Sequence, residues 1–209
     1  LTIPQFTVIT GLVIIFLGTV ILSSPFCSSS EVGLWEAFFT STSAITVTGL
    51  TVIDIGKDLT VLGQIFLAVM LLSGGLGLMA ITTFLQGFVV KGAKLRTRLD
   101  KGKTLDEFGV GGIGRTFQSI ALTAAIIISL GAFILYFFGF IDITNNGERL
   151  WASIFHSISA YNNAGFSIWS SSMYEYRTNF IVNIVFIILI VLGGLGWRVI
   201  DDIWTNRRN

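Results

Sequence analysis

The sequence predicts an all-α membrane protein built from two parallel repeats, each with a transmembrane helix, a re-entrant helix and loop, and a second transmembrane helix. Hydrophobic residues make up 53% of the chain, charged residues only 12%, and the mean hydropathy is +0.81. Four long stretches are apolar, and one segment of the chain recurs 116 positions later. Because a soluble domain carries about 25% charged residues, we expect this chain to lie in a lipid bilayer.

Four stretches are long enough to cross a membrane, which requires about 20 predominantly apolar residues. They are residues 3–22, 59–90, 116–141 and 179–197. The second stretch exceeds a simple crossing, so we expect it to tilt or to extend into the cytoplasm.

Two further apolar stretches, residues 32–53 and 150–169, are rich in Ser and Thr or Asn and make poor spanning helices. Ten of the thirteen Lys and Arg residues fall in 91–115 and 198–208, and basic loops near spans are retained in the cytoplasm. Both basic segments, and the N-terminus, lie inside only if 32–53 and 150–169 are re-entrant. The expected location is the inner (plasma) membrane.

The repeat defines the expected domains. Residues 34–44 recur as 150–160, and the small polar turn that follows recurs at the same offset. Each copy is then followed by Gly-Gly-Leu-Gly, at 74–77 and at 193–196. Polar turns repeated within apolar surroundings predict a pore assembled from equivalent units. We place the first pore unit at 1–90, a basic cytoplasmic linker at 91–115 and the second pore unit at 116–209.

Each repeated turn has the character of an ion filter preceded by a pore helix. In a potassium-selective filter, backbone carbonyl oxygens replace the hydration shell of the ion, and glycine leaves no side chain in the conduit. The candidate ion-binding residues are Thr46, Val47, Thr48 and Gly49 in the first copy, and Asn162, Asn163, Ala164 and Gly165 in the second. The alternative for either turn alone is an ordinary connection between hydrophobic helices, and recurrence in register favours the filter.

These residues resemble a known family. Residues 43–50, the Gly-Gly-Leu-Gly that follows, and residues 155–167 are similar to the first two pore units of the Trk/Ktr/HKT potassium transporters, most closely in the membrane subunits of bacterial Ktr systems. The resemblance implies potassium uptake, passive or coupled to sodium, through one pore surrounded by four units. It implies that Gly49 and Gly165 are two of four filter glycines. It also implies a homodimer of the full-length protein and a nucleotide-binding cytoplasmic regulatory subunit.

The third and fourth units of that family are absent from these 209 residues. We therefore expect a fragment of a four-unit transporter, and the alternative is that two copies complete a ring of four. A different functional class remains open, namely a non-conducting membrane assembly subunit whose re-entrant segments only pack.

Enzymatic chemistry, a cofactor and a nucleic-acid partner are not expected. His156 stands alone, so it favours a packing role over a metal or catalytic site, and no nucleophile-elbow motif accompanies Ser157 and Ser159. Residues 109–114 match a dinucleotide fingerprint but precede a membrane span, which favours a flexible bend. Asp54 and Asp58 either concentrate cations at the outer mouth or are solvated loop carboxylates. Cys27 is the only cysteine, so no disulfide forms within one chain.

Overall fold

The computed structural model describes residues 3–77 and 110–195, with side chains described within 8–77 and 118–195. Within these ranges the regular secondary structure is helical, apart from one isolated β-bridge between Ser28 and Leu59, and the helices are joined by loops and turns. The elements are α1 (Ile3–Leu22), α2 (Leu34–Ile45), α3 (Ile55–Asp58), a helix at Val61–Gly77, α5 (Val110–Ile134), the π-helical segment η2 (Leu135–Gly139), α6 (Asn146–Tyr161), the short 3-10 helix η3 (Tyr174–Tyr176) and α7 (Phe180–Leu195). The helix at Val61–Gly77 is called the 61–77 helix below.

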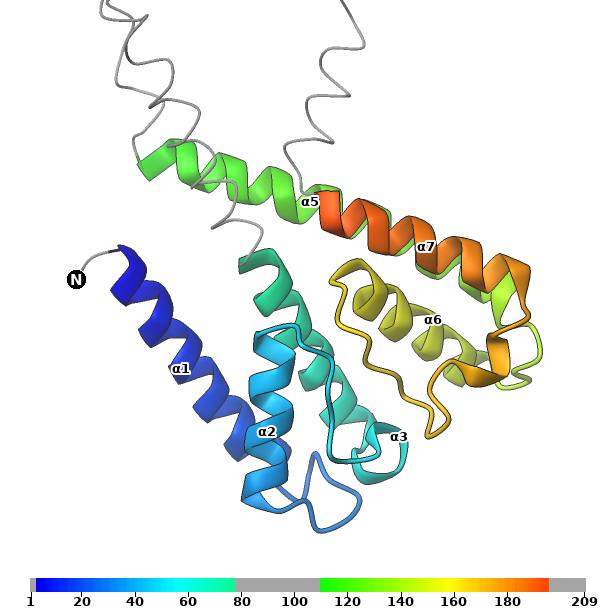
Figure 1. Cartoon of the computed structure of the whole chain (residues 1–209), viewed down its shortest axis with the longest axis horizontal. Coiled ribbons are helices and arrows are strands. Elements are labelled where there is room, and N and C mark those ends of the chain that lie inside the picture. The colour runs from blue at the N-terminus through cyan, green and yellow to red at the C-terminus, as the bar shows by residue number, and fades with distance from the viewer. Residues whose placement is uncertain (1–2, 78–109, 196–209) are drawn as a thin grey trace, which may run out of the picture.

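The first three long helices lie together, with α2 packed against α1 (Figure 1). Gly18 of α1 faces Met70 of the 61–77 helix so closely that a β-carbon at residue 18 would collide with the Met70 side chain. The loop between α1 and α2 is tied to the start of the 61–77 helix, because the Thr60 hydroxyl donates to the Phe26 carbonyl at 2.8 Å. These contacts hold α1 and the loop that follows it against the 61–77 helix.

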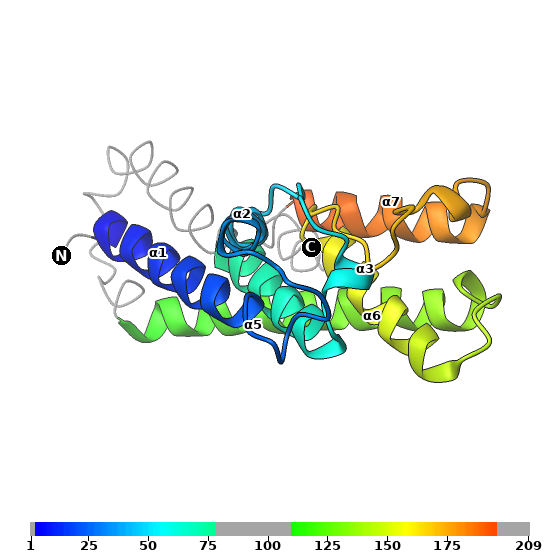
Figure 2. The same ribbon diagram turned by 90° about the horizontal axis from the view of Figure 1, so that it is seen from below.

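The second group repeats this arrangement, with α6 packed against α5 and α7. Asn145 caps α6, since its side chain accepts a hydrogen bond from the Gly147 amide at 2.9 Å. Gly131 of α5 faces Leu189 of α7, where an added β-carbon would lie 2.9 Å from a Leu189 methyl carbon. This close approach corresponds to the one between Gly18 and the 61–77 helix. Seen from below, α2 appears nearly end-on, with the α3 loop beside the chain that follows α6 (Figure 2).

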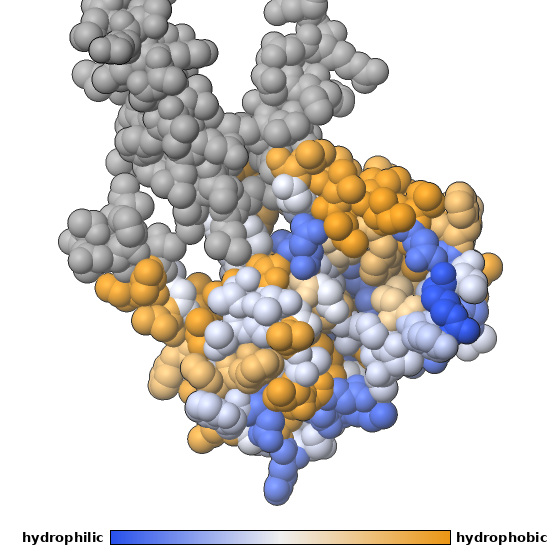
Figure 3. Space-filling view, viewed as in Figure 1, coloured by the Kyte–Doolittle hydropathy of each residue, from blue (hydrophilic) through white to orange (hydrophobic). Residues whose placement is uncertain are grey.

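The distribution of polarity is that of a protein surrounded by an apolar medium. Exposed apolar side chains recur every four residues, at Val8, Leu12 and Phe16 on α1 and at Leu122, Ile126 and Leu130 on α5. Side chains with hydroxyl groups are instead buried within α2 and α6. In Figure 3 apolar surface gathers over α7 at the upper right and along α1 at the left, whereas hydrophilic surface lies at the lower and right-hand ends and in the middle of this face. A continuous exposed apolar surface marks contact with a membrane or with other protein.

The expected spans correspond to helices with changed bounds. The first matches α1, and the fourth contains α7. One described helical stretch, Gln118–Gly139, is long and apolar enough by itself to cross a membrane. Three further apolar helices are shorter within the described residues, at Val8–Leu22, 61–77 and Phe180–Leu195.

The flexible bend expected at residues 109–114 is wrong for residues 110–114. These residues form the first turns of α5, which begins at Val110, six positions before the expected start of the span. Glycine lowers helix propensity by about 1 kcal/mol relative to alanine without preventing a helix, and the apolar sequence that follows continues the helix. The basic segments 91–109 and 198–208 lie outside the described residues.

Candidate functional site

The helices α2 and α6 end in the same turn, built from the same hydrogen bonds. After α2, the Thr48 amide donates to the Ser43 carbonyl at 2.9 Å and the Val47 amide donates to the Ala44 carbonyl at 3.3 Å. After α6, the equivalent bonds join the Ala164 amide to Ser159 at 2.9 Å and the Asn163 amide to Ala160 at 3.0 Å. All donors and acceptors are 116 positions apart. This pairing is the Schellman cap of a helix C-terminus.

The backbone angles repeat as well. Val47 and Asn163 have φ of 55° and 58°, and Gly49 and Gly165 have φ of 82° and 74°. Positive φ is common for glycine and tolerated by asparagine, but it is rare for a β-branched residue such as valine. Two turns with different sequences therefore adopt the same backbone conformation. This holds even at Val47, a residue that disfavours positive φ.

The two turns lie against each other. A β-carbon on Gly49 would overlap the carbonyl oxygen of Ala164 and lie 2.8 Å from the carbonyl carbon of that residue. Backbone thus contacts backbone with no side chain between them, which only glycine at residue 49 permits. Gly165, the equivalent glycine, has open space at its β-carbon position. The structure brings the two predicted segments together on one side, and no described residue covers the other side of the second turn at Gly165.

The eight candidate residues differ in exposure, and their carbonyl oxygens share one property. Asn162 and Ala164 are buried, Val47 and Gly49 are half-buried, and Thr46, Thr48, Asn163 and Gly165 are exposed. Within the described part of the chain, no hydrogen bond is accepted by any of the eight carbonyl oxygens. Unpaired backbone carbonyls need another partner, which can be water or a cation.

The ends of α2 and α6 add a favourable field for a cation. The C-terminus of a helix carries partial negative charge on its last carbonyl groups, and both helices end directly before a candidate turn. The Thr46 hydroxyl donates back to the Thr42 carbonyl at 2.8 Å and lies 2.7 Å from the Thr48 hydroxyl. The first turn therefore presents oxygen atoms from both backbone and side chains.

Glycines of the Gly-Gly-Leu-Gly segments support the two turns from behind. An added β-carbon at Gly74 would collide with the Ile45 carbonyl oxygen, and one at Gly193 would collide with the Tyr161 carbonyl oxygen. Ile45 and Tyr161 are the last residues of α2 and α6. The sequence located these glycines by their recurrence and did not indicate that they contact the last carbonyls of the two helices. The signal that could have revealed their contact is the recurrence of Gly-Gly-Leu-Gly after each turn.

His156 is fully buried and occupied by packing. One ring nitrogen lies 2.8 Å from the Ala152 carbonyl, the other lies 3.0 Å from the Ser167 hydroxyl, and the ring stacks on Trp169 with centroids 4.1 Å apart. Among the residues whose side chains are described, no group of three His, Cys, Asp or Glu side chains could hold a metal ion. The contacts of His156 favour the structural role.

Asp54 and Asp58 are engaged within their own loop. Asp54 caps α3 and pairs with Lys57 at 3.1 Å, and the Asp54 amide donates to the Asp58 carboxylate at 2.8 Å. The Ser170 hydroxyl, together with Lys57, lowers the pKa of Asp54 below its usual range. A β-carbon on nearby Gly56 would collide with the Ile168 carbonyl oxygen. The loops that follow the two turns are therefore in contact at this end of the molecule.

Comparison with known proteins shows that the sequence is similar to those of cation transport proteins. The family model described as "TrkH: Cation transport protein" matches residues 4–208. The chain is 34% identical to the Ktr system potassium uptake protein B of Bacillus subtilis, over 98% of this chain and 46% of that protein. It is 31% identical to the protein of the same name from Vibrio alginolyticus, over 98% and 45%. It is also 31% identical to the potassium/sodium uptake protein NtpJ of Enterococcus hirae, over 94% and 44%. The chain thus spans less than half the length of these relatives.

Proposed function

Because the chain belongs to the TrkH cation transport protein family, we propose that it takes up potassium ions across the plasma membrane through a filter of backbone carbonyl oxygens. Residues 46–49 and 162–165 form two of the walls of this filter. Relatives that cover most of this chain are named potassium uptake proteins, which supports potassium as the cargo. Transport through such a filter needs no covalent step and no cofactor.

One observation carries this proposal. The two candidate turns have the same hydrogen bonds and the same positive φ angles, they touch through their backbones, and their carbonyl oxygens accept no hydrogen bond from the described residues. A Schellman cap is a common way for a helix to end, but the repetition extends to Val47, a β-branched residue at positive φ, which favours a shared role for the two turns. Irregular backbone at membrane depth is tolerated where it lines a water-filled cavity, and free carbonyls there can replace the hydration shell of an ion.

The proposal assigns a role to each part of the repeat. The helices α2 and α6 act as re-entrant pore helices whose C-terminal ends favour a cation. The glycines at 49 and 165 keep the conduit free of side chains, and those at 74 and 193 let the outer helices support the pore helices. The two units have the same orientation, with the N-terminus and the basic segments in the cytoplasm.

A ring around one ion path needs more than two walls, and the chain covers 46% of its Bacillus subtilis relative. We therefore propose that this chain supplies two of four pore units. The word "system" in the names of two relatives supports work with further components, among which we expect a cytoplasmic nucleotide-binding regulatory subunit. Sodium coupling is part of the same proposal, because one relative is named for both potassium and sodium.

Growth on limiting potassium tests the proposal. The chain is expressed in a host without potassium uptake, together with the part of the Bacillus subtilis relative that lies beyond its match to this chain. Gly49→Arg is expected to abolish growth at normal membrane expression, because a bulky cation then occupies the ion path. Gly147→Arg, the same change in an exposed turn at the start of α6, is the matched control and should grow. Unchanged uptake by Gly49→Arg would contradict the filter and favour a non-conducting subunit.

Ion selectivity provides a second test of the filter at the same turn. Gly49→Ser is expected to weaken the preference for potassium over sodium, since its side chain displaces the facing Ala164 carbonyl. The measurement is the ratio of potassium to sodium uptake in the same cells. An unaltered ratio with unaltered rates would show that the carbonyls at this turn do not coordinate the ion.

A further inference from the structure

The chain that leaves the second turn is bonded to its own pore helix by two side chains. The outgoing segment is defined here as residues 166–169, directly after that turn. The Ser159 hydroxyl on α6 donates to the Phe166 carbonyl at 2.7 Å, and a ring nitrogen of His156 lies 3.0 Å from the Ser167 hydroxyl. Because residues 156 and 159 are three positions apart, they share one face of α6. Two consecutive residues of the outgoing segment are thus bonded to that face.

The hydrogen bonds of His156 have a defined direction. The Ala152 carbonyl can only accept, so the ring nitrogen Nδ1, which lies 2.8 Å away, carries a proton. In the neutral ring Nε2 then accepts a hydrogen bond from the Ser167 hydroxyl. The Ser167 oxygen in turn accepts a hydrogen bond from the Trp169 amide at 3.1 Å, and the Trp169 ring stacks on the imidazole. One side chain therefore links the backbone of α6 to the outgoing segment.

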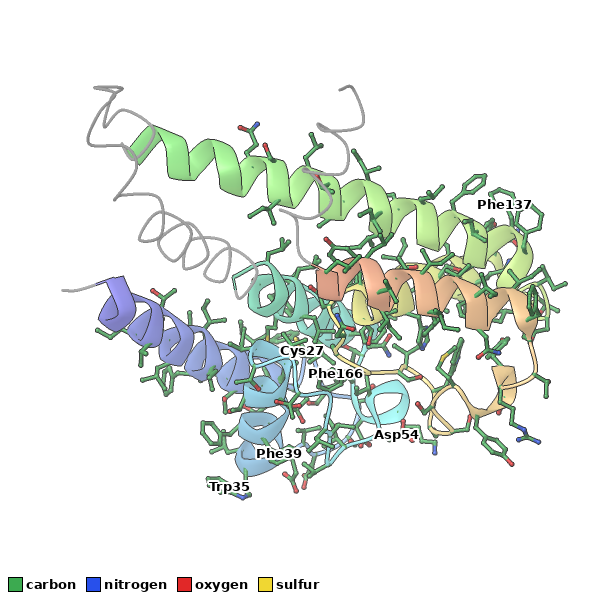
Figure 4. The ribbon with its side chains drawn as sticks, turned by 45° about the horizontal axis from the view of Figure 1, so that its top comes forward. Cys27, Trp35, Phe39, Asp54, Phe137 and Phe166 are labelled. Atoms are coloured by element: carbon green, nitrogen blue, oxygen red, sulfur yellow. The ribbon has the colours of Figure 1, made fainter. Side chains whose placement is uncertain are left out.

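These links are shielded from water. His156, Ser159 and Phe166 are each 3% exposed or less, and Figure 4 shows Phe166 in the middle of the molecule. A hydrogen bond in such surroundings is stronger than one at the surface, and water does not replace a partner that is removed. The two side chains of α6 therefore hold the outgoing segment firmly.

The first repeat has the same positions but not the same links. At the offset of 116, Thr40 and Ser43 of α2 correspond to the histidine and the serine of α6. Both hydroxyl groups are buried, and neither forms a hydrogen bond with any described residue. Leu50, the counterpart of Phe166, is 60% exposed. The chain that leaves the first turn is therefore not bonded to α2 at these positions.

One feature of the outgoing segment is common to both repeats. The Thr51 hydroxyl oxygen, at the position of Ser167, accepts a hydrogen bond from the Ile53 amide at 3.2 Å. The Ser167 oxygen accepts the Trp169 amide in the same way. The bonds to the pore helix, and not this local turn, are thus what distinguish the second repeat. Threonine at residue 51 also shows that the turn forms with either hydroxyl residue.

The two candidate filter turns are consequently supported in different ways. The first turn rests on the second, because Gly49 lies against the Ala164 carbonyl. The second turn ends at Gly165, whose φ of 74° is one of several conformations open to glycine. The bonds to Phe166 and Ser167 follow immediately and limit the movement of the chain after this glycine. The position of both turns therefore depends on how the outgoing segment is held.

We infer that His156 and Ser159 are positioning residues for ion selectivity. They fix residues 166 and 167, and this keeps the carbonyl oxygens of residues 162–165 at the spacing that favours potassium over sodium. Neither side chain contacts the ion in this scheme. The inference rests on the proposed function, since it names the residues that hold one wall of the filter.

Selectivity is the property that responds, because it depends on small displacements of oxygen atoms. A filter distinguishes potassium from sodium through the number and placement of its carbonyl oxygens. When the outgoing segment is loosened, these oxygens can move to fit the smaller ion. A purely structural role would instead lower the amount of folded protein, and the uptake of both ions would fall in proportion.

The ratio of potassium to sodium uptake tests the link from Ser159. The chain is expressed with the remaining part of the Bacillus subtilis relative, and uptake is corrected for the amount of chain in the membrane. We expect Ser159→Ala to lower the ratio by about five-fold, the factor that corresponds to one average hydrogen bond. Ser43→Ala, the same change at the matching position of the first repeat, should leave the ratio unchanged.

The link from His156 is tested at its partner, so that the buried ring stays in place. Ser167→Ala removes the hydroxyl that bonds to the ring and should also lower the ratio. Ser167→Thr keeps a hydroxyl, as the first repeat does, and should preserve it. The matched control is Thr51→Ala, which breaks the same local turn in the repeat that lacks the link, and its ratio should equal that of the unmodified chain. Equal ratios for Ser167→Ala and Ser167→Thr would exclude the hydroxyl link.

Three results would overturn the inference as a whole. The ratio could stay unchanged in Ser159→Ala and Ser167→Ala, the uptake of both ions could fall in proportion, or the controls in the first repeat could lower the ratio equally. Failure of the proposed function is distinguishable from each of these. In that case Gly49→Arg leaves uptake intact, whereas failure of the inference alone leaves Gly49→Arg inactive.

Discussion

Replacing each turn glycine by alanine separates backbone conformation from contact between the turns. Gly49 and Gly165 have φ of 82° and 74°, so Gly49→Ala and Gly165→Ala impose nearly the same conformational cost, about 1–2 kcal/mol for an L-residue in a left-handed conformation. The two sites differ in surroundings. The new methyl group at residue 165 enters open space, whereas that at residue 49 overlaps the Ala164 carbonyl oxygen.

The additional cost at residue 49 follows from the identity of the obstructing atom. A carbonyl oxygen of the backbone moves only if its peptide group moves, and inserting a methyl group into a packed site costs about 1–3 kcal/mol. We therefore expect Gly165→Ala to lower the free energy of unfolding by about 1–2 kcal/mol and Gly49→Ala to lower it by about 2–5 kcal/mol.

Denaturant unfolding of the purified chain in dilute detergent, followed by circular dichroism, measures both values under conditions where it is monomeric. Equal destabilisation by the two substitutions would refute the reasoning, because it would mean that the first turn does not touch the second.

Three further substitutions test other parts of the structure in the same unfolding assay. Gly74→Ala drives a methyl group into the last carbonyl of α2 and should lower the free energy of unfolding by about 1–3 kcal/mol. Gly11→Ala, on the open side of α1, should leave the free energy of unfolding unchanged or raise it. Equal effects of the two substitutions would argue against the contact between Gly74 and the Ile45 carbonyl. Asn145→Ala removes the cap of α6 and should cost about 1 kcal/mol, with Asn145→Ser retaining most of the stability. The folded-state pKa of Asp54 is lowered from 3.8, so its carboxylate contributes to the free energy of unfolding above that pH, and this contribution is lost as the pH falls below it. Asp54→Asn should therefore reduce the loss of stability in that pH range. An unchanged dependence of stability on pH would contradict the pKa shift.

Much of the local structure was predictable because it depends on neighbours in sequence. The apolar stretch 3–22 has the bounds of α1, since nothing within it interrupts a helix. The turns at Gly49 and Gly165 were located from recurrence, and their positive φ angles agree with the need for glycine. The assignment of these turns to an ion path stays a prediction.

What the sequence did not predict are contacts between segments far apart in the chain. No periodicity indicates that Trp151 donates to Gln64, because the pairing depends on how α6 packs across the 61–77 helix. The start of α5 at Val110 was also missed, since three nearby glycines suggested a bend and the continuing apolar sequence overrode their local preference. The asymmetry between Gly49 and Gly165 likewise appears only when both turns are placed in space.

The direct apposition of peptide groups at Gly49 and Ala164 has a consequence for divergence. Bond lengths and angles of the main chain are the same for every amino acid. The distance between the backbones of the two turns therefore does not depend on the rotamer of any side chain. Neighbouring side chains can then be replaced while the distance between the two turns stays constant. Such an arrangement suits a family whose members retain only 34% or 31% identity to this chain.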